Sequence, residues 1–189
     1  MTSIAPPFDH EEYLHLAIEA VRRGDHGAAL GYLKEGAAHY PEDARIAYML
    51  GAEHAQIGLY DRAEAEMSRA IALNPVLHVA RFQLGLLQMT QSRPAESHAT
   101  WLGLDVLPDG HALRLFRDGL EALVEERYDD ARRALQAGLS SKDISDDLGR
   151  DMQNLLARIP ESGQNSVVAN GEGTGHVWLN AYQNSDQPE

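Results

Sequence analysis

The stretch ARIAYMLGAEHAQIGLYDRAEAEMSRAIALNPVL, from Ala44 to Leu77, contains the pattern that predicts the fold of most of the chain. Shifting it by 34 residues in either direction places small residues over small residues. The position of Gly51 is matched by Ala17, Gly85 and Gly119. A fixed period of this size is typical of a solenoid, in which each repeat buries its apolar face by stacking on its neighbours.

The quoted stretch contains two helical patterns separated by a tight turn. Apolar and small residues recur at helical spacing in its first half, and Gly58 then favours a helix end. Asp61 follows as the expected N-cap of a second helix, with Glu64 three residues later. Asn74-Pro75 ends that helix, because the residue before a proline disfavours helical backbone. The sequence therefore predicts a helical hairpin as the repeating unit.

This pattern resembles the tetratricopeptide repeat (TPR) family, in which 34 residues form two antiparallel helices. The positions that carry the resemblance are Leu50-Gly51, Ala63, Met67, Ala70 and Pro75. The stretch departs from the family pattern at Ala47 and His54, where Trp and Tyr are usual. The resemblance implies an all-α fold, a right-handed TPR-type solenoid of about four helical hairpins closed by a C-terminal capping helix.

The period also predicts the division of the chain. An N-terminal arm and four repeats are expected at 1–9, 10–43, 44–77, 78–111 and 112–143. Asp9 is expected to cap the helix that begins near His10. Ser145 is expected to cap a further helix at 144–160, whose single apolar stripe suits it to close the end of a helical stack.

The C-terminal tail, 161–189, has a different composition, with no Lys or Arg and several Gly, Asn and Ser residues. We expect it to be flexible or extended, because Asn170-Gly171 is a turn signal and an alternating pattern typical of a strand or short hairpin follows it. A lone hairpin is marginal in water, so the tail is either largely disordered or docks through its large apolar residues. Those residues are Val177, Trp178, Leu179 and Tyr182.

Composition excludes several classes of protein. With 189 residues, of which 43% are hydrophobic, the chain is long enough to bury a core. The absence of cysteine excludes disulfides, thiol nucleophiles and thiolate metal sites. No run of about 18 apolar residues occurs, so we expect no membrane insertion and a cytoplasmic location. A net charge of −13 repels a phosphate backbone, so no nucleic-acid partner is expected.

No pattern of residues points to catalysis, a cofactor or a metal. Paired acids such as Glu125-Glu126 lie at expected turns, where runs of charge are usually solvated. His10-Glu11 begins like the zinc motif HExxH, but the next histidine, His15, lies about 140° away around a helix. We therefore expect a protein that is not an enzyme and that binds no cofactor.

The TPR resemblance implies a concave groove lined by the first helix of each hairpin. Here the groove is predicted to be apolar and to bind a peptide or helix of a partner protein, either apolar or basic in character. The candidate groove residues are Leu14, Ile18, Tyr48, Met49, Phe82, Leu86, Met89, Phe116 and Leu120. The alternative is that about half of these positions belong to the core between repeats, since a helix in a stack buries more than one stripe.

The leading functional hypothesis is a non-enzymatic scaffold or adaptor for protein–protein interaction. One alternative is a cytoplasmic TPR chaperone of a bacterial secretion system, a family that the chain resembles in size, acidity and apolar groove. The other is self-association or autoinhibition, in which the tail strand docks on the repeats of its own chain or forms a homodimer.

Overall fold

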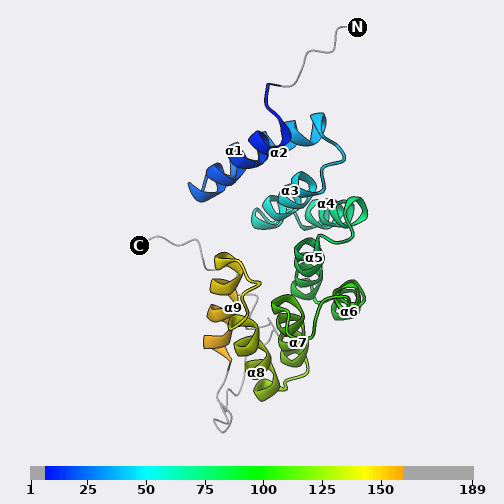
Figure 1. The fold of residues 1–189 in the computed structure, drawn as a ribbon, viewed down its shortest axis with the longest axis vertical. Coiled ribbons are helices and arrows are strands. Elements are labelled where there is room, and N and C mark those ends of the chain that lie inside the picture. Colours follow the sequence, from blue (N-terminus) through cyan, green and yellow to red (C-terminus); the bar gives the residue numbers. More distant parts are fainter. Residues whose placement is uncertain (1–6, 160–189) are drawn as a thin grey trace, which may run out of the picture. The chain divides into compact units, whose positions relative to one another are not determined.

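A computed structural model of the chain describes residues 7–159. Those residues form α-helices and one short 3₁₀ helix, and they contain no strand. The predicted all-α fold is therefore confirmed for this range, whereas the strand or hairpin expected in the tail lies outside it. The chain divides into two compact units, Met1–Gly103 and Leu104–Glu189 (Figure 1). The single solenoid domain spanning residues 10–160 stays a prediction.

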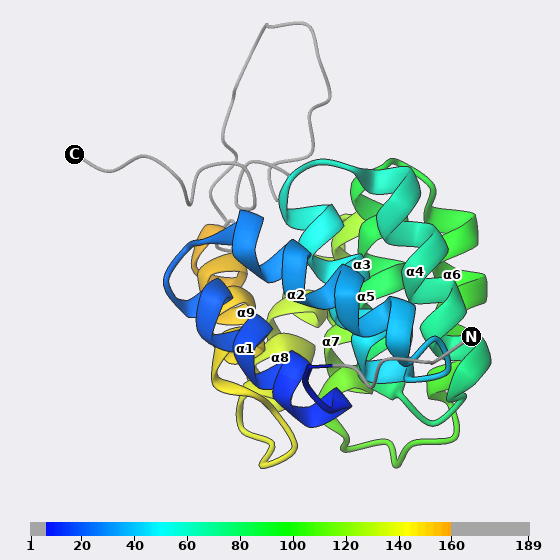
Figure 2. The same cartoon turned by 90° about the horizontal axis from the view of Figure 1, so that it is seen from above.

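Unit 1 consists, in its described part, of consecutive helical hairpins. The helix bounds are α1 His10–Arg22, α2 His26–His39, α3 Ala44–Gln56, α4 Tyr60–Leu73, α5 His78–Thr90 and α6 Pro94–Trp101. Helices α1 and α2, α3 and α4, and α5 and α6 pack against each other as pairs (Figure 2). Successive pairs also pack together, α2 on α3 and α4 on α5, so each hairpin covers an apolar side of the next.

Unit 2 carries a further hairpin and one more helix in its described part. Its helices are α7 Ala112–Val124, α8 Tyr128–Leu139 and α9 Asp146–Arg158. Helix α8 packs on α7 and on α9. The predicted N-cap Ser145 is confirmed, since its side chain accepts a hydrogen bond from the backbone N–H of Leu148. The boundary between the units falls within the 3₁₀ helix η1, Leu102–Leu104.

Helix N-caps follow the sequence signals at two places and depart from them at a third. Asp9 caps α1 in a capping box with Glu12, as expected. Asp61 is not the N-cap of α4, so that prediction was wrong. Gly58 adopts φ of +76°, and the backbone N–H of Leu59 donates to the His54 carbonyl at 2.8 Å, so that α4 begins one residue before Asp61. The Asp61 carboxylate instead lies in the first helical turn, where it suits the helix dipole.

The paired helices approach closely at small residues. At Gly51 of α3, an added Cβ would lie 2.8 Å from the Met67 side chain and 3.1 Å from the Ala63 carbonyl oxygen of α4. At Gly85 of α5, an added Cβ would overlap the Trp101 indole of α6. That indole is fully buried, and its Nε1–H donates to the Phe82 carbonyl at 2.9 Å. The small residue thus lets a large one on the facing helix reach the core.

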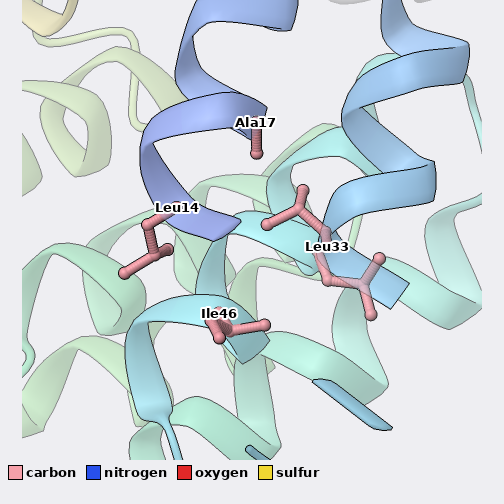
Figure 3. Close-up of a cluster of buried hydrophobic side chains, with 5 residues drawn as sticks. Leu14, Ala17, Leu33 and Ile46 are labelled. Atoms are coloured by element: carbon pink, nitrogen blue, oxygen red, sulfur yellow. The ribbon is translucent and has the colours of Figure 1, made fainter. Parts of the chain in front are cut away.

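An apolar cluster joins the first hairpin of unit 1 to the second. Leu14 and Ala17 of α1, Leu33 of α2, and Ile46 and Leu50 of α3 are buried together, and Figure 3 shows the side chains meeting between the three helices. An added Cβ at Gly36 of α2 would lie 3.2 Å from the Ile46 side chain, so α2 and α3 are also close. Burial of this cluster is what keeps α1 and α3 in a fixed relation.

The close approach at Gly85 predicts a specific stability change. Gly85→Ala should lower the free energy of unfolding of unit 1 by about 1–3 kcal/mol, because the methyl group displaces the Trp101 ring. Gly31→Ala in the middle of α2 is the matched control, since an added Cβ there meets nothing within 4 Å. The control should raise stability by about 0.5–1 kcal/mol through helix propensity alone. Urea unfolding followed by Trp fluorescence measures the first effect and circular dichroism the second, and equal stabilisation of both variants would contradict the account.

Candidate functional site

Helix α1 has one buried side and one exposed side. Tyr13, Ala17 and Ala20 are completely buried, whereas Ile18 is 37% exposed. The exposed residues recur four, seven and eleven positions apart, which places them in one stripe along the helix. That stripe consists of Glu11, His15, Ile18 and Arg22.

Helix α3 carries a corresponding stripe. Arg45 and Gln56 are exposed and Met49 is half-buried, at a spacing of four and seven residues. Met49 packs against the buried cluster that contains Leu14 of α1. Arg45 makes an ion pair with Glu11 of α1 at 2.7 Å, which ties one end of the two stripes together. We name the surface formed by Glu11, His15, Ile18, Arg22, Arg45, Met49 and Gln56 the α1–α3 face.

Polar contacts fix the end of this face where α1 and α3 begin. The Asp43 carboxylate caps α3 through the backbone N–H groups of Arg45 and Ile46. It also accepts hydrogen bonds from the His10 ring at 2.8 Å and from Arg45 at 3.2 Å. Burial alone would raise the pKa of Asp43, but these hydrogen bonds outweigh it and lower the pKa to about 2. The hydrogen bonds that Arg45 donates to the carboxylates of Glu11 and Asp43 in turn raise the pKa of Arg45.

The structure separates the predicted groove residues into two groups. Ile18 is exposed, and Tyr48 and Met49 are half-buried. Six others are buried in the core, at 0–6% exposure: Leu14, Phe82, Leu86, Met89, Phe116 and Leu120. Burial raises the pKa of Tyr48 to about 12, so its hydroxyl stays neutral at physiological pH. For a partner that binds to the surface, the accessible part of the predicted set is therefore Ile18 and Met49, with the edge of Tyr48.

Two aromatic rings show why the buried group is core. In unit 1 the Phe82 ring stacks on Trp101 at 5.8 Å between ring centroids, on the hairpin side of α5. In unit 2 the Phe116 ring occupies the space that a side chain at Gly138 of α8 would fill. Both rings are completely buried, so Phe82→Glu would report on folding rather than on binding.

Sequence reasoning missed the polar border of the face, namely Glu11, Arg45 and the Asp43–His10 pair. A usable signal was present, because His10 and Asp43 are 33 residues apart and Glu11 and Arg45 are 34 apart, close to one repeat. Opposite charges separated by one period meet between neighbouring hairpins of a stack. The candidate tail residues Val177, Trp178, Leu179 and Tyr182 lie outside the described residues.

Residues 7–159 contain neither a candidate metal site nor a candidate membrane-spanning helix. Within that range no group of three or more His, Asp or Glu side chains is placed to hold a metal ion. None of the helices described there has both the length and the apolar character needed to cross a bilayer.

Comparison with known proteins agrees with the hairpin geometry. The sequence profile of the tetratricopeptide repeat family matches residues 14–78. Residues 14–78 therefore carry tetratricopeptide repeats. The matched range runs from α1 into the first residue of α5, so it contains most of the α1–α3 face. Stacking of two successive TPR hairpins therefore accounts for the way their first helices, α1 and α3, lie beside each other.

Solved structures of MamA share the fold of this chain. A crystal structure of MamA is 24% identical with a TM-score of 0.59, covering 71% of this chain and 79% of that chain. A MamA structure from Desulfovibrio magneticus RS-1, covering residue 41 to the end of that protein, is 22% identical with a TM-score of 0.58. The match covers 80% of this chain and 84% of the MamA chain. At these identities the likeness concerns the fold alone. No curated protein sequence matches the chain.

The hydrogen bonds at the end of the α1–α3 face predict that Asp43 contributes to stability in a pH-dependent way. Because the folded pKa lies below the usual value, ionised Asp43 stabilises unit 1 above pH 4, and the stabilisation is lost as the pH falls through 2. Asp43→Asn should therefore lower the free energy of unfolding by about 1–2 kcal/mol at pH 7, and about half of that difference should vanish by pH 3. Urea unfolding of both proteins at the two pH values measures it. A difference that is the same at pH 7 and pH 3 would contradict the assignment.

Proposed function

We propose that the chain is a non-enzymatic scaffold or adaptor that binds a peptide or helix of a partner protein on the α1–α3 face. The observation that carries the proposal is the outward position of Ile18 and Met49 on first helices of TPR hairpins, where the neighbouring large side chains of the predicted groove are buried. An apolar surface framed by charged residues is typical of a protein-interaction site.

The size of the face supports a modest affinity. Complete burial of an Ile or Met side chain contributes roughly 1.5–3 kcal/mol, and both residues are already partly buried. Their combined contribution is therefore about 2–3 kcal/mol before the costs of association. Contacts with the polar border have to supply the rest, so we expect affinities in the micromolar range or weaker.

Charge suggests the character of the partner. The chain has a net charge of −13, and the end of the face carries the exposed carboxylates of Glu11, Glu12 and Glu42. Arg45 and His10 offset them in part at that end, and both already contact Asp43. A partner with an apolar side chain followed by basic residues suits this surface. A cytoplasmic location, the secretion-chaperone alternative and the tail-mediated alternative stay predictions.

A matched pair of substitutions tests the face. Peptides selected from a random display library against the full chain should include binders whose affinity falls at least tenfold for Ile18→Glu, because a carboxylate replaces the apolar contact. Leu73→Glu on α4 is the control, since Leu73 is 38% exposed against 37% for Ile18 and lies outside the face. Fluorescence anisotropy with labelled peptides gives the affinities. Binders that lose affinity equally in both variants, or in neither, would refute the proposed face.

A further inference from the structure

His54 of α3 is a buried histidine without a hydrogen-bond partner in the described part of the chain. Its residue is 5% exposed, and neither Nδ1 nor Nε2 is within bonding distance of a partner there. A tyrosine is usual at this position of the repeat that the sequence resembles. Buried polar groups are nearly always hydrogen-bonded, and leaving one unpaired is unfavourable. The ring is therefore tolerated only in its neutral form, in which it packs between the helices as an aromatic side chain.

Charged groups of α2, α3 and α4 interact electrostatically with this ring. Lys34 of α2 and Arg62 of α4 are the cations, and Glu66 of α4 and Glu53 of α3 are the carboxylates. Burial lowers the pKa of His54, the two cations lower it further, and the two carboxylates oppose the shift without cancelling it.

Both carboxylates already have other partners. Glu53 accepts a hydrogen bond from the His26 ring of α2 at 2.9 Å, and its side chain is 8% exposed. Glu66 makes an ion pair with Arg69 one turn along α4 at 3.3 Å. A proton on His54 would thus add a buried charge beside two cations. Glu53 is hydrogen-bonded to His26, and Glu66 Oε2, which has no hydrogen-bond partner among the described residues, lies in the ion pair with Arg69.

We propose that His54 is an acid-sensitive switch in unit 1, and that protonation of its ring loosens the packing of α3 against α2 and α4. The direction follows from linkage. Near neutral pH both the folded and the unfolded chain carry a neutral His54. As the pH falls below about 6.5, the unfolded or locally opened chain binds a proton that the folded chain resists, so the stability of unit 1 decreases.

Loosening of α3 would also disturb the α1–α3 face, because Arg45 and Met49 lie on the same helix as His54. This consequence for partner binding rests on the proposed function, whereas the switch itself does not. Acid would then release a partner that neutral pH retains, through a histidine that lies outside the α1–α3 face.

Hydrogen exchange in the full chain tests the switch. Exchange rates at pH 7.5 and pH 5.5, corrected for the intrinsic rates, give the opening equilibrium of each helix. In the wild type, opening of α3 and α4 should increase at the lower pH by up to about tenfold, the limit when the ring titrates at the ordinary pKa of about 6.5 in the opened chain and stays neutral in the folded one. His54→Phe keeps an aromatic ring without a titrating group and should remove this increase.

A control and a second measurement complete the test. His98→Gln removes an exposed histidine of α6, outside the α1–α3 face, and should leave the pH dependence of α3 and α4 as in the wild type. An NMR titration of the His54 ring in the wild type needs no variant and should give a pKa below 6.5. A pKa at or above 6.5, or an unchanged pH dependence in His54→Phe, would overturn the switch. Peptide binding is read separately, so failure of the proposed face leaves these outcomes unaffected.

Discussion

The structure depends on how closely two helices of a hairpin can approach. In unit 1, Gly51 lies against Met67 and Ala63, and Gly85 lies against Trp101. In unit 2, an added Cβ at Gly119 would lie 2.9 Å from the Leu135 side chain. In each case the missing side chain on one helix makes room for a large one on the other. Packing of this kind leaves little room for change, because protein interiors have few voids. The small residues in the sequence therefore mark the positions where two helices of a hairpin are in contact.

That same constraint explains what could be predicted from the sequence. The recurrence at Ala17, Gly51, Gly85 and Gly119 predicted hairpins because a small residue is required at every crossing. The caps at Asp9 and Ser145 were predictable because the acceptor side chain stands directly before an apolar stripe. Asp61 was wrongly predicted as an N-cap because Gly58 forms the turn before α4 and no side-chain cap is needed there. A pattern of residue types does not reveal this.

The candidate site was harder to predict than the fold. Helical spacing identifies which face a residue occupies, but it does not reveal how much of that face the neighbours cover. Phe82 was expected in the groove and is instead buried against Trp101, because a large ring at a crossing can reach the core. Ile18 is exposed and Met49 is half-buried, and their side of α1 and α3 is bordered by charged side chains. In the sequence His54 is only a departure from the family pattern, and its burial without a hydrogen-bond partner among the described residues became visible only in the structure.

The account rests on the division of the predicted groove into an accessible pair and a buried set. The chain contains no cysteine, so single cysteines report accessibility without interference. Ile18→Cys and Met89→Cys replace an exposed and a 4% exposed residue of the same predicted groove. Under native conditions the thiol at position 18 should react with a maleimide at least about a hundredfold faster than the thiol at position 89, which reacts only after local opening. Equal labelling rates at the two positions would contradict the account.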